Sequence, residues 1–390
     1  MIDSLKCSCS VRAEIIDSLR RIALDSLKKM YLRNEGLFAF RIRRGPSGEL
    51  TEGTSRRYTA IALIGLAGET PPQVGHILAG HDAKGVCSRL VEGVDGLVNL
   101  GDVALILWAC RAWGHAGRNR AVERLIDMKP DTGVYPVVEL AWALTALTVC
   151  PSGPSDLTLA DRIARRLIHS QSPESGLFPH WPIEAGRHWL RGHVACFADL
   201  VYPIQALSRF HKATGCTDAL AAAKRCARSV LGLQGDDGQW WWHYDVRTGR
   251  VLERYPVYSV HQDSMAPMAL LSLPEDCLPG RFEAINRSLN WLVYSGEIGG
   301  SLVDHDSGII WRKVARKELA KISRKLQAVS SRLHSSLRAP LTDRLFPPIA
   351  IDFESRPYHM GWILHTWPAT DATHIPLKSN ETDASTFVNA

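Results

Sequence analysis

Apolar residues recur at three- and four-residue steps through most of the chain, which is the period of an amphipathic helix. The segments with this pattern come in pairs: one with an apolar stripe and a charged face, then a turn with glycine and aromatic residues, then a more uniformly apolar segment. Residues 218–234, the turn "DDGQWWW" and residues 261–273 form such a pair. We expect the first helix of each pair to face water and the second to face a core.

Six such pairs follow one another along the chain. They are 13–32 with 56–68, 71–93 with 101–114, 119–128 with 137–149, 157–171 with 197–215, 218–234 with 261–273, and 281–296 with 356–367. A lone helical hairpin cannot bury its apolar face, whereas stacked hairpins share a continuous core and six of them can close into a ring. The pattern predicts an all-α fold, a single (α/α)6 toroid over residues 1–375. A small β-hairpin is expected within 243–258, and 376–390 is expected to be a disordered tail.

One segment interrupts the sixth pair. Residues 311–338 carry much of the positive charge of the chain, and their apolar residues recur at helical spacing: Leu319, Ile322, Leu326, Val329, Leu333 and Leu337. This spacing predicts an inserted basic amphipathic helix at about 312–340. A solvated helix packed on the body explains it, and contact of 312–338 with a membrane surface or an acidic polymer is the alternative. No nucleic-acid-binding motif accompanies the charge, so nucleic acid is not an expected partner.

Composition adds the expected compartment. The chain has 390 residues, of which 45% are hydrophobic and 22% charged, with a net charge of +6, all ordinary for a globular protein. It shows neither a signal-peptide pattern nor an apolar run long enough to span a bilayer. Nine cysteines, an odd number without a disulfide framework, favour reduced thiols. We therefore expect a cytoplasmic protein, with peripheral contact at the inner membrane face if the basic helix binds lipid.

Two stretches resemble known families. In "QGDDGQW", the spacing of Gln234, Gly238 and Trp240 resembles the repeat of squalene-hopene-type cyclases, and "QSPESGLF" at Gln171 is a looser copy. In that family the glutamine and tryptophan staple neighbouring helices, so the resemblance implies a structural role. "GGSLVDHD" and "RPYHMGW" are similar to the zinc-binding stretches of protein prenyltransferase β-subunits, and they supply Asp304 and His359. The cysteine position of that family holds Asp306 here, so no metal or cofactor is predicted.

A third resemblance concerns carbohydrate enzymes. The stretch "YPIQALSRFHKATG", which begins at Tyr202, is similar to inner-helix phrases of (α/α)6 enzymes, in which an aromatic residue, a small-residue helix and a "TG" turn follow one another. Those enzymes include unsaturated glucuronyl hydrolases, epimerases of the N-acylglucosamine 2-epimerase type and polysaccharide lyases. The resemblance implies an oligosaccharide or small-molecule substrate bound in the central cavity.

Candidate catalytic residues stand where inner helices begin, because these ends converge on one mouth of a toroid. They are Asp263, His261, Asp199, His359 and Tyr358. Buried polar groups are costly unless they are satisfied or used, and Asp199 among hydrophobic neighbours is a candidate proton donor. Each group also has a structural alternative: Asp263 as a helix cap, Asp199 in an ion pair, and the cluster around His359 as a polar network closing the ring.

Candidate substrate-binding residues accompany them: Arg356, Glu354, Arg191, His193, Tyr202, Tyr258, Gln262, Trp241, Trp242 and Tyr58. Other polar residues at these helix starts are Arg56, Arg57, Asp102 and Glu139. Aromatic rings stack on sugars or stabilise carbocations, and a guanidinium binds a carboxylate or phosphate. We predict a hydrolase, lyase or epimerase that acts on an acidic or lipid-linked glycan by general acid/base catalysis. A terpenoid cyclase or prenyl-binding toroid at a membrane surface is the first alternative, and a non-catalytic toroid that binds a protein or peptide is the second.

Overall fold

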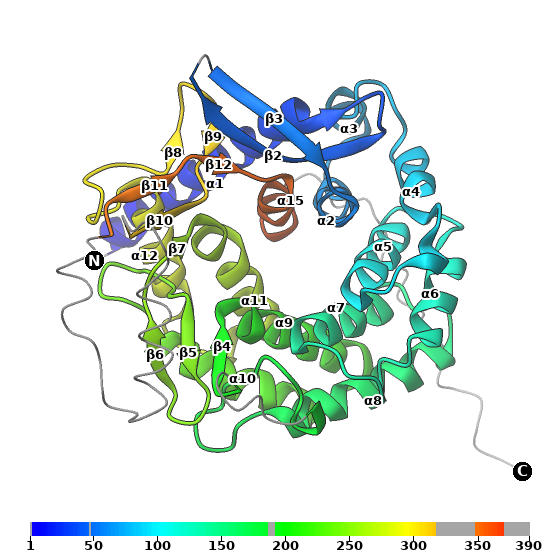
Figure 1. The fold of residues 1–390 in the computed structure, drawn as a ribbon. Coiled ribbons are helices and arrows are strands. Elements are labelled where there is room, and N and C mark those ends of the chain that lie inside the picture. The colour runs from blue at the N-terminus through cyan, green and yellow to red at the C-terminus, as the bar shows by residue number, and fades with distance from the viewer. Residues whose placement is uncertain (1, 47, 186–191, 317–347, 370–390) are drawn as a thin grey trace, which may run out of the picture.

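Six helices surround a central axis and six outer helical segments surround them in turn (Figure 1). The computed structural model describes residues 2–46, 48–185, 192–316 and 348–369. The inner helices are α2 (Arg56–Leu66), α5 (Leu100–Ala112), α7 (Val137–Thr148), α9 (Phe197–Thr214), α11 (Ala266–Ser272) and α15 (Pro357–Thr366). The outer ones are α1 (Ile2–Met30), α3 (Pro71–Ile77) with α4 (Ala83–Val91), α6 (Arg118–Asp127), α8 (Pro154–Ser170), α10 (Thr217–Gly232) and α12 (Arg281–Val293). The predicted toroid of paired helices is confirmed.

Burial separates the two rings as the hydrophobic pattern predicts. In the inner helix α5 every residue except Asp102 and Ala112 is buried, whereas only Ala121 and Leu125 are buried in the outer helix α6. A uniformly apolar helix is stable only when it is covered on all sides, which places it inside the ring.

One outer helix differs from its prediction. The segment 71–93 is two helices, α3 and α4, because Ala79 and Gly80 take left-handed backbone conformations (φ 50° and 86°) that an α-helix cannot continue.

The ring closes where the first and last inner helices meet. Gly65 of α2 and Gly361 of α15 face each other so closely that a Cβ added at Gly361 would lie 2.5 Å from the Ile61 carbonyl oxygen. The absence of side chains at both positions lets the two backbones touch. Chain ends far apart in sequence are joined here, which leaves no open edge of the toroid.

Glutamine side chains staple neighbouring outer helices, as the cyclase resemblance implies. Gln234 Nε2 donates to the carbonyls of Gly238 (2.9 Å) and Ala284 (2.8 Å), the latter in α12. Gln171 repeats the arrangement one unit earlier, donating to Gly176 and to Ala222 of α10, both at 2.8 Å. Both glutamines make the same two kinds of contact, so the repeat in the sequence corresponds to a repeated structural unit.

Four small antiparallel sheets lie where outer helices lead into inner ones. The strands are β1 (Tyr31–Leu32), β2 (Leu37–Gly45), β3 (Gly48–Thr54) and β12 (Glu354–Ser355); β7 (Val257–Tyr258), β10 (Lys313–Ala315) and β11 (Ala350–Asp352); β4 (Val194–Cys196), β5 (His243–Asp245) and β6 (Arg250–Glu253); and β8 (Val303–Asp304) with β9 (Ile309–Ile310). The predicted hairpin is confirmed as β5–β6. The longer hairpin β2–β3 was not anticipated.

The predicted basic helix needs a correction at its start. Lys313–Ala315 form strand β10, which pairs with both β7 and β11 and buries Val314 completely. Burial alternates within β10: Val314 is buried, whereas Lys313 and Ala315 on either side are half-buried, as expected for a strand. The rest of that segment, 317–347, lies outside the described residues, as do Arg191 and the predicted tail 376–390. Among the helices that the structure describes, none is long and apolar enough to cross a bilayer.

Candidate active site in the central cavity

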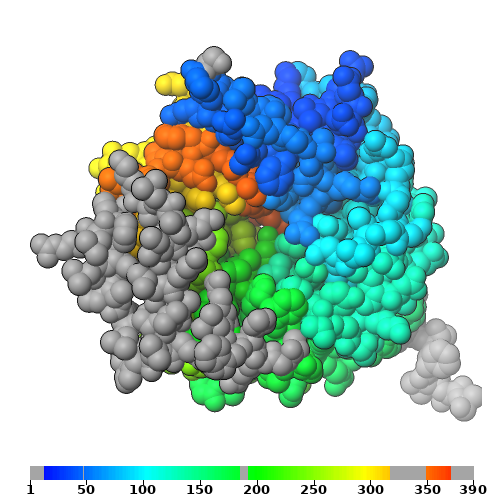
Figure 2. Space-filling model, in the orientation of Figure 1, coloured from blue at the N-terminus to red at the C-terminus, as the bar shows by residue number. Residues whose placement is uncertain are grey.

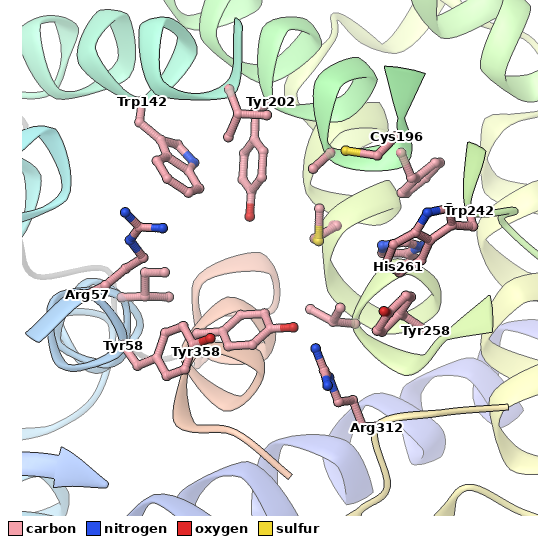
Figure 3. Close-up of a pocket in the computed structure, with 16 residues that line it drawn as sticks. Arg57, Tyr58, Trp142, Cys196, Tyr202, Trp242, Tyr258, His261, Arg312 and Tyr358 are labelled. Carbon is pink, nitrogen blue, oxygen red and sulfur yellow. The ribbon is translucent and has the colours of Figure 1, made fainter. Parts of the chain in front are cut away.

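A cavity of about 270 Å³ lies in the centre of the ring, at the mouth where the inner helices begin. Figure 2 shows that the centre of the ring is hollowed, and Figure 3 shows the side chains around the cavity. The lining residues come from five of the six units and from the segment before β10: Arg57, Tyr58, Ile61, Val138, Trp142, Cys196, Phe197, Ala198, Tyr202, Trp242, Tyr258, Val260, His261, Met265, Arg312 and Tyr358. Inner helices that start together therefore bring side chains from distant parts of the chain to one space.

The lining has a distinct chemical character. Seven of its residues are aromatic, two are arginines and one is a histidine, and none of the lining residues that the structure describes is Asp or Glu. The hydroxyls of Tyr202 and Tyr358 and the guanidinium of Arg312 point into the open space (Figure 3). The cavity is thus built for aromatic stacking, anion binding and proton transfer by uncharged groups.

His261 is held neutral in this lining. Burial lowers the pKa of His261 to about 3, and its Nδ1 has no hydrogen-bond partner among the residues that the structure describes. Its ring packs against Phe197 and Tyr258, with centroids 4.6 and 5.1 Å away. The imidazole is therefore uncharged at neutral pH, and the hydrogen-bonding capacity of its Nδ1 is not used by the described residues.

The backbone around His261 is a π-helical turn, η3 (His261–Met265), that leads into α11. Pro267 has no N–H to donate to the Asp263 carbonyl, as an α-helix would require, and Trp367 Nε1 donates to that carbonyl instead (2.6 Å). Single π-turns of this kind often occur at functional sites, where they redirect side chains.

The tyrosine hydroxyls are proton donors at neutral pH. Burial raises the pKa values of Tyr202 and Tyr358 above the usual range, so both remain phenols. The Tyr358 ring lies 4.9 Å from that of Tyr58, whose hydroxyl accepts a hydrogen bond from Arg356 Nη1 (2.7 Å). Arg312 hydrogen-bonds to Tyr358. A neutral acceptor and neutral donors therefore share one cavity.

Carboxylates hold the two arginines from behind. Arg312 Nη1 lies 3.1 Å from Glu354 Oε1, and its guanidinium stacks 5.2 Å from the Tyr258 ring centroid. Burial by itself would raise the pKa of Glu354, but hydrogen bonds from Arg356 and Arg41 hold it below the usual value. This anionic Glu354 fixes the orientation of Arg312.

On the wall opposite Trp242 and Tyr258, Arg57 is fixed in the same manner (Figure 3). Its Nε donates to Asp102 Oδ1 (2.6 Å) and its Nη2 to Asn99 Oδ1 (2.7 Å). Asn99 in turn donates to Glu139 (2.9 Å). The other terminal nitrogen of Arg57 makes none of these bonds, so it is available to a ligand.

Several solved structures share this architecture. The structure is similar to the unsaturated glucuronyl hydrolase of Bacillus sp. GL1 (14% identity, TM-score 0.56, covering 90% of this chain and 95% of that one) and to the cellobiose 2-epimerase of Bacillus thermoamylovorans B4167 (10%, 0.55, 78% and 95%). It is also similar to an inactive variant of the α-1,6-mannanase of Salegentibacter sp. HEL1_6 (13%, 0.50, 91% and 97%). The chain has the (α/α)6 toroid fold. No protein-family model and no curated protein sequence matches it.

Several predicted residues of the toroid lie just outside the cavity. The buried pair of His359 Nε2 and Asp263 Oδ2 (2.7 Å) joins α15 to η3 directly behind Tyr358 and His261. Asp199 is fully buried and accepts hydrogen bonds from His180 Nδ1 (2.9 Å) and from the Cys196 amide (2.8 Å) at the start of α9. Asp199 is therefore paired, as its structural alternative expected, and it also caps α9, whereas Asp263 bonds to His359 and does not cap a helix. Neither carboxylate lines the cavity.

Other predicted ligand-binding residues have structural contacts. Trp241 packs against Tyr255, with centroids 5.9 Å apart, and away from the cavity, so the expectation that it binds substrate is corrected. Gln262 is fully buried and accepts a hydrogen bond from the Trp240 amide (3.1 Å). His193 is buried beside Asp245.

Glu354 and Arg356 form the layer behind the lining. The predicted residues that do line the cavity are Tyr58, Tyr202, Trp242, Tyr258, His261 and Tyr358.

The structure adds residues that the sequence reasoning missed. Trp142 lies one turn into an apolar helix, and only its direction toward the axis distinguishes it from core. Arg312 was assigned to the basic helix, whereas the structure places it directly before strand β10, in the cavity lining. Cys196 lines the cavity at the start of α9, but burial raises its thiol pKa well above the usual value, so it is not a thiolate nucleophile.

The prenyltransferase-like metal residues are not brought together. Asp304 accepts a hydrogen bond from Trp311 Nε1 (3.1 Å) at the β8–β9 turn, whereas His359 bonds to Asp263 inside the ring. Within the described ranges, no group of three or more His, Cys, Asp or Glu side chains is arranged to hold a metal ion.

Proposed function

We propose that this toroid is a carbohydrate-active enzyme that binds an acidic sugar and moves a proton at the carbon next to its carboxylate, as a lyase or epimerase does. The observation that carries the proposal is the lining of the cavity: arginines, phenols and a neutral imidazole, without a carboxylate among the described lining residues. The cavity volume, about 270 Å³, suits a short segment of a glycan.

The same lining argues against hydrolysis by the usual route. Glycoside hydrolases place two carboxyl groups on either side of the scissile bond, one as acid and one as base or nucleophile. Asp102, Asp263 and Glu354 are not among the described lining residues: Asp102 and Glu354 pair with the lining arginines Arg57 and Arg312, and Asp263 bonds to His359. Within the predicted set of hydrolase, lyase and epimerase, the last two are favoured.

Each residue has a role in this chemistry. Arg312, beside Tyr358, binds the sugar carboxylate and stabilises the negative charge that develops on it when the neighbouring C–H bond breaks. His261 Nδ1 accepts that proton. In elimination, the electron pair forms a C=C bond as the C–O bond to the next sugar breaks, and a phenol, Tyr358 or Tyr202, protonates the departing oxygen. In epimerisation, a phenol returns a proton to the opposite face of the carbon.

The similar structures support a sugar substrate. By name, they act on unsaturated glucuronyl groups, cellobiose and α-1,6-mannan, three different glycan chemistries on one fold. Fold alone does not select among them, because unrelated reactions share this ring. The terpenoid alternative has the aromatic lining in its favour, but two guanidinium groups in the same cavity would repel a carbocation.

Incubation with a panel of uronic-acid oligosaccharides in D2O tests the proposal. A lyase yields an unsaturated uronate with new ultraviolet absorbance, and an epimerase yields product carrying deuterium at the carbon next to the carboxylate. New reducing ends with neither signature would show hydrolysis and overturn the proposed chemistry. Turnover of prenyl diphosphates in a parallel incubation would favour the terpenoid alternative.

Matched variants connect any activity to the cavity. His261→Gln and Tyr358→Phe remove the proposed base and one proposed acid, and we expect each to lower turnover by about 10²- to 10⁴-fold. Arg120→Gln is the control, because Arg120 pairs with Asp95 on the outer surface (51% and 58% exposed). Activity that survives both cavity variants would contradict the assignment.

A further inference from the structure

We infer that the cavity has two chemically different walls, one for an acidic sugar unit and one for a neutral sugar unit, so that the substrate is a mixed glycan bound in a fixed order. This inference rests on the proposed function and adds the residues that set specificity. It follows from the ion pairs behind the two arginines of the lining, which differ in net charge.

The wall around Arg312 has excess positive charge. Its connected ion pairs join five cations to three carboxylates: Arg41, Arg43, Arg312, Lys313 and Arg356 with Glu52, Asp352 and Glu354. Among the described residues, five cations against three carboxylates give an excess of two positive charges, with Asp352 joined to the group through Arg312 and Lys313. The Nε of Arg312 is buried and has no partner in the part of the chain that the structure describes. A carboxylate of the ligand would supply the missing negative charge.

The wall around Arg57 has the opposite balance. Arg57 pairs with Asp102 (2.6 Å), and Glu139 joins the same network through Asn99. One guanidinium faces two carboxylates, so a second anionic sugar would be repelled here. An ion pair of this kind offers a donor and an acceptor side by side, which matches the hydroxyl groups of an uncharged sugar.

Each wall also has an aromatic surface for a sugar ring. Trp142 lies beside Arg57, with the guanidinium carbon 5.8 Å from its ring centroid. Trp242 and Tyr258 stack on each other at 4.4 Å beside Arg312. Because aromatic faces pack against the apolar faces of sugar rings, each wall has the parts to hold one unit.

Exposure sets the order of the two units. The side chain of Arg57 is 35% exposed and that of Arg312 is 20% exposed, and the ring of the proposed base His261 lies 5.1 Å from the ring of Tyr258 on the Arg312 wall. The acidic unit therefore binds deep, next to the proposed base, and the neutral unit binds nearer to solvent. The cleaved or inverted position would be on the inner, acidic unit.

Calorimetry with defined sugars tests this arrangement. The probes are a free uronate, a uronate–hexose disaccharide in which the hexose is linked to the C4 oxygen of the uronate, a uronate–uronate disaccharide with the same linkage and a hexose–hexose disaccharide. The C4 linkage supplies the C–O bond that breaks in elimination. We expect uronate–hexose to bind most tightly. Arg312→Gln should weaken binding of all three probes that contain a uronate by about 10- to 100-fold, the usual effect of losing a charged hydrogen bond.

Two variants of the wall around Arg57 test the second sugar position separately from the first. Trp142→Leu should weaken uronate–hexose by about 3- to 10-fold and leave the free uronate unchanged. Asp102→Asn removes one negative charge from the wall, so the preference for uronate–hexose over uronate–uronate should shrink by about two- to fivefold. A structural role for Asp102 alone would weaken both disaccharides equally. Circular dichroism confirms that each variant is folded.

The outcomes separate the two proposals. If the wild-type protein binds no uronate at all, the proposed function fails and the inference fails with it. If it binds uronates but prefers uronate–uronate, or if Trp142→Leu weakens the free uronate as much as the disaccharide, only the two-wall inference is overturned.

Discussion

Acidification should destabilise this protein, and His261 should account for a defined part of the loss. Its pKa is about 3 in the folded chain because it is buried, against about 6.5 in an unfolded chain. Between these values the unfolded state binds a proton that the folded state does not. Stability contributed by neutral His261 is therefore complete above about pH 6.5 and is lost as the pH falls toward 3.

The size of the effect follows from the two pKa values. Between about pH 7.5 and about pH 5, linkage gives a loss of about 2 kcal/mol in the free energy of unfolding from this one group. The result depends little on the folded-state value so long as it lies below about 4. His365 is a second example of the same effect, because burial lowers its pKa to about 3 as well. Its ring lies beside Trp108 and Trp362.

Denaturant unfolding at several pH values measures this effect. His261→Gln removes the imidazole, so the stability difference between wild type and variant should shrink by about 2 kcal/mol from about pH 7.5 to about pH 5. Tyr258→Phe, at the neighbouring ring, is the control and should leave the pH slope as in wild type. Equal slopes for wild type and His261→Gln would mean that His261 titrates as an exposed imidazole does, and the argument from its burial would be wrong.

Three further predictions use other parts of the ring. Gly361→Ala places a methyl group against the Ile61 carbonyl, and we expect a loss of at least about 1–3 kcal/mol in unfolding free energy by thermal or denaturant unfolding. Gln234→Ala leaves two buried carbonyls without their donor and should cost about 1–3 kcal/mol, with no change in ligand affinity. Asp263→Asn weakens the bond to His359, so it should lower turnover more than it raises KM; a pure stability defect would contradict a positioning role.

The hydrophobic pattern anticipated the ring because helix periodicity is local. An inner segment such as 101–114 is apolar on every side, whereas an outer segment such as 119–128 has a polar face. The pattern therefore predicts which of the two helices is covered by the rest of the protein. Helix starts are local as well, which is why Tyr58, His261 and Tyr358 were placed correctly at one mouth. Strands were anticipated poorly, since a short strand such as β10 is stabilised by partners far away in sequence.

The candidate site could be predicted from the sequence only in part, for the same reason. Asp263 and His359 are separated by 96 positions, and their hydrogen bond decides that neither lines the cavity. Asp199 looked like an acid in an apolar stretch, but the Cys196 amide and His180 take up its oxygens. A polar group that hydrogen-bonds to a neighbouring residue is not free to bind a ligand. These hydrogen bonds join residues far apart in the sequence, so the sequence pattern does not reveal them.

By itself, the sequence determined the alternation of helices, their closure into a ring and the end of the ring at which polar residues gather, because periodicity and capping act over a few residues. Tertiary structure alone decided the rest: that the carboxylates lie behind the lining, that His261 is desolvated, and that Arg57 and Arg312 have different charge environments. Charge, burial and pKa are properties of the surroundings of a side chain, and those surroundings are assembled from all parts of the chain.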